Sequence, residues 1–205
     1  MSVEANTLAP FAPVVRRVAS ALVLLAVAAG CKPAASTDHR DAATEDPAMA
    51  TATTIELTSK SFQEGASIPK SHTGDGKDTS PALRWSDPPT GTRAFALICD
   101  DPDAPRRTWV HWVVYDLPAD ARALDEGMQR DASLASGAKQ GKNDFGKTGY
   151  GGPAPPPGKP HRYLFKLYAL DAPTGLPTGA TKEQVLTAIK GHVLGEGQLM
   201  GRYGR

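Results

Sequence analysis

Short apolar runs separated by glycine and proline make up most of the chain after residue 54. Four of these runs are rich in β-branched and aromatic residues and have the length of globular strands: 54–58, 93–99, 109–115 and 161–170. A fifth run, 198–203, predicts a last strand that returns to the sheet. The pattern therefore indicates a mostly β domain.

One segment near the end of the chain has helical periodicity instead. Apolar residues recur at helical spacing over 185–193, and Thr181 with Gln184 three positions later forms a capping box. Gly195 is expected to end this helix. A second helix over 119–125 stays open as an alternative, since the segment is short and directly follows a proline.

The N-terminal part contains a different apolar run, 18–30, which follows Arg16 and Arg17. A permanent membrane-spanning helix needs about 18 or more apolar residues, so this shorter run predicts an export signal. The alternative, a buried amphipathic helix, is disfavoured because the run has no polar stripe at helical spacing.

Small residues at 28–30 directly precede Cys31, and this resembles the lipobox at which bacterial lipoproteins are cleaved and lipidated. Ala28 stands where a larger aliphatic residue is preferred, so ordinary secretion remains the alternative. We expect a lipoprotein-type signal peptide over 1–30 and a lipid on Cys31. That lipid would anchor an exported protein to a membrane of the cell envelope, whereas ordinary secretion would give a soluble periplasmic or secreted protein.

Residues 31–53 lack aromatic side chains and are rich in Ala, Thr, Asp and Pro, which predicts a flexible tether. The folded domain is expected over 54–205. The only cysteine besides Cys31 is Cys99, within an apolar run, where it is expected to be a small buried core residue.

Composition narrows the class of protein. With 205 residues, of which 40% are hydrophobic, the chain is long enough for one good core. Lys and Arg number 23 against 22 Asp and Glu, so no strong one-sign field attracts nucleic acid. The 20 glycines and 18 prolines suit the tight turns between short strands.

Polar residues gather where the predicted strands begin or end. Asp101 and Asp103 follow the run 93–99, His111 lies near the start of the next run, and His161 and Tyr163 open the run 161–170. Each alone has a structural explanation, such as a turn-capping aspartate or an interior histidine. Together they predict one pocket.

Side chains alternate between the two faces of a strand, so His161 and Tyr163 are expected to point the same way. The same rule groups Trp109 and His111 with Val113 and Tyr115 on one face.

Protonation suggests what such a pocket binds. Carboxylates next to imidazoles favour the charged imidazolium, which, together with a phenol, donates hydrogen bonds to a phosphate-like oxyanion. A carboxylate receives an ammonium or hydroxyl group. The expected ligand is a phosphoryl head group that carries an amine or alcohol.

A long stretch over 131–159 is dense in glycine and proline towards its end. Loops of this length are more often ligand-facing than idle. An alternative is that its proline-rich part is recognised by an aromatic groove of another protein.

Five motifs, in the order in which they occur along the chain, resemble the phosphatidylethanolamine-binding protein family, in particular its bacterial Raf kinase inhibitor-like members of the YbhB/YbcL type. They lie at 79–85, 101–105, 111–114, 144–150 and 155–163, within a similarity that covers about 54–203. The resemblance implies a β-sandwich-like fold with a few peripheral helices, one of them near the C-terminus, and a small anion pocket. By motif position the implied ligand-binding residues are Asp101, Asp103, Pro105, His111, Pro156, His161 and Tyr163.

The family is known for binding phosphorylated head groups and for inhibiting kinases or proteases. We therefore expect a non-enzymatic binding protein with no cofactor, no metal and no catalytic residue. A protein-interaction module that inhibits a kinase or protease is one alternative. A metal-assisted or acid–base hydrolase that uses Asp101, Asp103, His111 and His161 is the other, but the chain has no His-Glu-x-x-His, Gly-x-Ser-x-Gly or phosphate-loop pattern.

Overall fold

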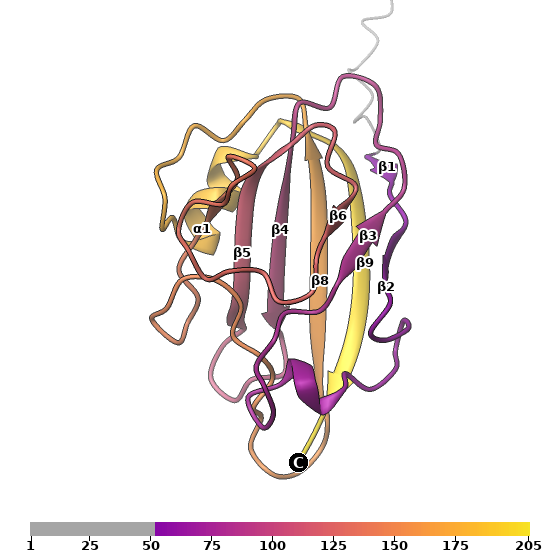
Figure 1. Ribbon diagram of the computed structural model, residues 1–205, viewed down its shortest axis with the longest axis vertical. Helices are drawn as coiled ribbons and strands as arrows, with labels where there is room; N and C mark the ends of the chain where they lie inside the picture. The colour runs from indigo at the N-terminus through magenta and orange to yellow at the C-terminus, as the bar shows by residue number, and fades with distance from the viewer. Residues whose placement is uncertain (1–51) are drawn as a thin grey trace, which may run out of the picture. The chain divides into compact units, whose positions relative to one another are not determined.

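Two sheets pack face to face in the computed structural model, which describes residues 52–205 (Figure 1). The large sheet has the order β1 (Thr53–Thr54), β9 (Val193–Tyr203), β8 (His161–Leu170), β4 (Ala94–Asp101), β5 (Trp109–Pro118) and β7 (Lys139–Gln140). The small sheet has the order β2 (Leu57–Ser59), β3 (Leu83–Trp85) and β6 (Ala123–Leu124). A 3-10 turn, η1 (Lys70–His72), and one helix, α1 (Lys182–Ala188), complete the described elements. The expected β-sandwich-like fold is confirmed.

The predicted signal peptide over 1–30, Cys31 and the tether up to residue 51 lie outside the described residues. β1 begins at Thr53, the last residue of the predicted tether.

Each face of the large sheet has its own core. On one face, alternate residues of β8 such as Phe165 and Leu167 pack against Leu83 and Trp85 of the small sheet. On the other face, Val185 of α1 is fully buried against β4 and β5. Cys99, on the face towards the small sheet, is buried and free, as expected. Alternation along strands that are covered on both sides thus produces three layers.

The predicted helix forms with its capping box at Thr181 and Gln184, but it ends at Ala188. The prediction that Gly195 ends it is wrong, because Gly195 lies inside β9. A Cβ at this position would lie 2.9 Å from the carbonyl oxygen of Thr53 in β1 and 2.9 Å from Pro89. Gly195 is therefore a position of close backbone approach rather than a helix cap.

Segment 119–125 contains no helix. Instead, Ala123 and Leu124 form β6 and pair with β3, which allows Leu124 to bury its side chain between the sheets. The strands over 93–99 and 109–115 also run further than predicted, since β4 extends to Asp101 and β5 to Pro118.

Candidate ligand-binding site

Three strand ends meet at one edge of the large sheet. β4 is antiparallel to both β5 and β8, so its last residue, Asp101, lies beside the first residues of the other two strands, Trp109 and His161. In Figure 1 this edge is at the lower end of the sheet. A cavity of about 200 Å³ opens there, and we call it the site cavity. It is lined by Asp101, Ala104, Pro105, Trp109, His111, Phe145, Ala154, Pro155, Pro156, His161 and Tyr163.

Six of the seven residues expected to bind ligand therefore surround one cavity, although the motif 155–163 is remote in the sequence from the motifs 101–105 and 111–114. Asp103 is the exception. Its carboxylate binds Arg162, with Oδ1 accepting from Nη2 at 2.7 Å and Oδ2 accepting from Nε and the backbone N–H at 2.9 Å. These hydrogen bonds lower the pKa of Asp103 to about 2, and they tie the loop after β4 to β8.

A β-bulge turns His111 into the site cavity. Cys99 of β4 pairs with Trp112, but the next residue, Asp100, pairs with Val110, so His111 is an extra residue in β5. Bulges interrupt the alternation of faces and redirect side chains. The expected grouping is consequently wrong beyond the bulge: Val113 packs in the core beneath α1, on the opposite face from the site cavity.

Tyr115 lies on that same α1 face, and it too was expected to share a face with His111. Its hydroxyl donates to the carbonyl of Pro177 and accepts from the backbone N–H of Ala180. Tyr115 therefore fastens the segment before α1 and takes no part in the site cavity.

Asp101 holds His161 in a fixed orientation. Its Oδ2 accepts from Nδ1 of His161 at 2.7 Å, and its Oδ1 accepts from the backbone N–H of Asp103 at 2.8 Å. The carboxylate thus caps the turn after β4, as the structural explanation of Asp101 predicts, and it also orients the imidazole. Nε2 is the remaining polar atom of the His161 ring.

His111 is held differently, by a backbone carbonyl. Nδ1 lies 2.6 Å from the carbonyl oxygen of Gly151, and since a carbonyl only accepts, Nδ1 carries the proton. Burial lowers the pKa of His111, so its ring is neutral near pH 7. The expectation that both imidazoles are charged is wrong for His111, because desolvation outweighs the nearby carboxylates.

Aromatic rings form the apolar wall of the site cavity. The ring of His111 packs edge-on against Tyr163 and Phe145, with centroid distances of 5.1 and 5.4 Å, and Phe145 packs against Trp109 at 5.6 Å. Burial raises the pKa of Tyr163, so its hydroxyl stays protonated. Within residues 52–205, no hydrogen bond occupies that hydroxyl.

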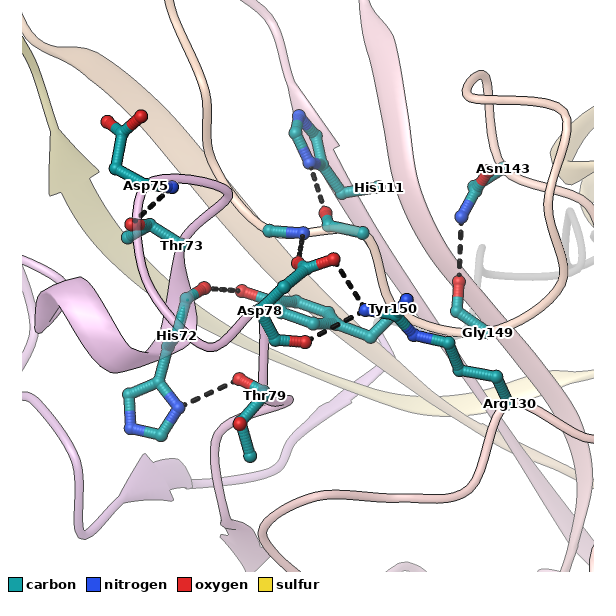
Figure 2. A network of polar contacts seen from close by, with 12 residues as sticks. His72, Thr73, Asp75, Asp78, Thr79, His111, Arg130, Asn143, Gly149 and Tyr150 are labelled. Atoms are coloured by element: carbon teal, nitrogen blue, oxygen red, sulfur yellow. Dashed lines mark hydrogen bonds and ion pairs between the residues drawn. The ribbon is translucent and has the colours of Figure 1, made fainter.

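Hydrogen bonds to several other parts of the chain hold the glycine-rich segment 149–152 in place, as Figure 2 shows. Asn143 donates to the carbonyl of Gly149 at 2.9 Å, and Tyr150 donates to the carbonyl of His72 at 2.8 Å. Asp78 accepts from the backbone N–H of Gly152 at 2.6 Å and is itself bound by Arg130. This network presents the Gly151 carbonyl to His111.

Sequence reasoning did not assign Phe145 or the residues of this network to the site. Phe145 lies in the motif 144–150 and Pro155 in the motif 155–163, so the resemblance pointed to both segments without giving their side chains a role.

In the described part of the chain, no three His, Cys, Asp or Glu side chains come together in a way that suits a metal ion. The helix found within residues 52–205 is too short to cross a membrane.

A family model described as phosphatidylethanolamine-binding protein matches residues 58–204. The chain belongs to the phosphatidylethanolamine-binding protein family. A UPF0098 protein from Methanothermobacter thermautotrophicus is 47% identical over 151 residues, which are 74% of this chain and 99% of that protein. UPF0098 protein YbhB from Escherichia coli is 44% identical over 124 residues, or 57% of this chain and 78% of YbhB.

Two crystal structures of this family share the fold. Chlamydia trachomatis CT736, described as a putative phosphatidylethanolamine-binding protein homologue, superposes with a TM-score of 0.68 at 40% identity, covering 75% of this chain and 99% of CT736. Escherichia coli YbcL, described as a new member of the mammalian family, gives a TM-score of 0.68 at 36% identity, covering 74% of this chain and 98% of YbcL. The resemblance to the YbhB/YbcL type is thereby confirmed.

Proposed function

We propose that this family member is a non-enzymatic binding protein whose site cavity holds the phosphoryl head group of a small ligand, or a similar anion. The observation that carries the proposal is the convergence of His111, His161 and Tyr163 on one cavity, with Asp101 orienting the His161 ring. The family name, which refers to a phosphorylated head group, agrees with this chemistry.

The size of the site cavity limits the ligand. Pockets for drug-sized molecules usually enclose about 300–1,000 Å³. At about 200 Å³, the site cavity accommodates a head group but not the remainder of a lipid. Its walls of proline and aromatic rings leave only a few polar side-chain atoms to determine what binds, among them Nε2 of His111, Nε2 of His161 and the Tyr163 hydroxyl.

Proton uptake is expected on binding. Because Nδ1 of His111 already donates to Gly151, its Nε2 presents a lone pair that repels an unprotonated oxyanion. A phosphate therefore either brings its own proton or causes His111 to take one up. In both cases the affinity rises as the pH falls, and for His111 the rise continues below 6.5, the ordinary pKa of histidine, because burial lowers the pKa of the free ring.

The lining residues favour binding over catalysis. The site cavity contains no Ser, Thr, Cys or Lys side chain to act as a nucleophile. Both oxygens of Asp101 are already engaged, by His161 and by the turn amide of Asp103. A hydrolase that used Asp101 itself as base or nucleophile would need one of these two contacts to be released first.

Titration with inorganic phosphate and phosphoethanolamine, followed by NMR of the histidine rings, tests the proposal. His111 and His161 should shift together, whereas His192, which pairs with Asp171 on the surface, should not move. His161→Ala should weaken binding by about tenfold or more, the value of a charge-assisted hydrogen bond, and His192→Ala should leave it unchanged. Unmoved resonances of His111 and His161 would refute the proposal.

We further propose that the protein is exported and held at a membrane by a lipid on Cys31. The small residues before Cys31 support this, and secretion without a lipid is the alternative. Mass spectrometry of the mature N-terminus distinguishes the two, because an unmodified start at any other residue excludes the anchor.

A further inference from the structure

A second hollow, of about 410 Å³, adjoins the site cavity. Pro156 and His161 line both, so they form the wall between the two spaces. The other residues that line it are Asp103, Pro157, Lys159, Pro160, Arg162 and Arg202, and we call this space the basic hollow. Three cations and one carboxylate thus lie directly beside the candidate ligand.

The charges in the basic hollow are not balanced. Asp103 directs both carboxylate oxygens at Arg162, and these bonds lower its pKa to about 2, so it stays ionised and neutralises that one arginine. Lys159 and Arg202 are both exposed, and neither has an ion-pair partner among residues 52–205. Two positive charges are left over.

The strand register brings like charges together. Arg162 of β8 is directly opposite Arg202 of β9. Like charges at directly opposed positions of an antiparallel pair destabilise the sheet, and Asp103 relieves this repulsion only on the Arg162 side. A bound anion between Lys159 and Arg202 would relieve the other side.

A third hollow, of about 450 Å³, shares Lys159, Pro160 and Arg202 and extends the surface as far as Arg205. The guanidinium of Arg205 is already paired with Asp75. The unneutralised charge is therefore confined to Lys159 and Arg202, at the side nearest His161.

We propose that the basic hollow is a second anion subsite, held by Lys159 and Arg202, and that the protein prefers ligands with two acidic groups. This rests on the proposed function, since the first acidic group occupies the site cavity. A phosphoryl group joined by a short linker to a carboxylate or to a second phosphoryl group has the required chemistry.

Calorimetric titration with matched ligands tests the subsite. Each alkylphosphonate with two to five methylene groups is compared with the α,ω-bisphosphonate of the same length, which differs only in its second anionic group. At one or more lengths the bisphosphonate should bind about tenfold or more tightly than its partner, and added salt should reduce the difference. Lys159→Gln with Arg202→Gln should abolish the preference without changing monophosphonate affinity more than about threefold.

Lys60→Gln with Arg84→Gln is the matched control, since these residues are also exposed cations but lie outside both spaces. The control should keep the full preference for bisphosphonates. If monophosphonates bind but no bisphosphonate binds better, the subsite is refuted and the proposed function stands. The subsite is also refuted if the preference survives in the Lys159→Gln, Arg202→Gln variant. If neither ligand class binds, the proposed function fails and the subsite fails with it.

Discussion

Replacing Lys182 by methionine should destabilise the protein more than most single substitutions at its surface. Lys182 is the first residue of α1, and its ammonium group lies 2.5 Å from Oδ2 of Asp100, a β4 carboxylate whose side chain is 1% exposed. Lys166 lies 3.5 Å from the other oxygen, which accepts no hydrogen bond. Asp100 therefore depends mainly on Lys182 for compensation of its buried charge.

The expected loss of stability depends on which charged groups each variant leaves without a partner. Removing one partner of a buried pair costs about 3–5 kcal/mol, and the lower end, about 3 kcal/mol, applies to Lys182→Met because Lys166 remains. Asp100→Asn leaves two lysines that are 17% and 32% exposed and can turn to water, so we expect about 1–2 kcal/mol. Lys166→Met should cost about 1 kcal/mol or less.

Urea unfolding of the single variants and of the double variant Asp100→Asn, Lys182→Met measures the coupling between the two residues. The double variant should lose less stability than the sum of its singles, by about 1 kcal/mol or more. In thermal unfolding, Lys182→Met should lower the Tm by about 6–12 °C for a domain of this size. A Lys182→Met cost below about 1 kcal/mol, or strict additivity, would show that the buried charge is compensated in another way.

Two further predictions concern the histidine and the glycine segment beside the site cavity. Because burial lowers the pKa of His111, the unfolded chain binds a proton more readily than the folded protein, so the free energy of unfolding should be highest above pH 6.5 and fall as the pH drops. In urea titrations at a series of pH values, His111→Gln should remove this part of the pH dependence. An unchanged pH dependence in the variant would contradict the reasoning. A Cβ on Gly152 would lie 2.6 Å from the carbonyl oxygen of His72, so Gly152→Ala should lower the free energy of unfolding by about 2–3 kcal/mol. Gly137 has open space around it but a φ of 86°, so Gly137→Ala should cost only about 1 kcal/mol. Equal losses of stability in chemical denaturation would refute the clash.

Much of the fold follows from local patterns in the sequence. The apolar run 161–170 coincides with β8, and the capping box at Thr181 correctly marks the start of α1. Such features depend on residues close together in the chain. The position of Gly195 within a strand does not depend on its sequence neighbours. It is determined by Thr53 of β1 and by Pro89, which lie close to Gly195 in space but far from it in the chain.

The same distinction applies to the site. Residues at strand ends could be assigned to a common edge, since antiparallel neighbours place those ends together. The orientation of Asp103 could not be foreseen, because it is set by Arg162 on another strand. Nor could the neutral state of His111, which results from burial that outweighs the opposite effect of the hydrogen bond to the Gly151 carbonyl.

Because His111 is an extra residue in β5, the direction of its side chain depends on the number of residues in the strand and not only on their type. If Val110 were deleted, His111 would take its place opposite Asp100 of β4, and the bulge would disappear. Trp112 would stay opposite Cys99, and the rest of the strand would keep its register. His111 would then turn towards the layer that contains α1. A single-codon deletion, with every histidine retained, would thus remove the His111 ring from the site cavity.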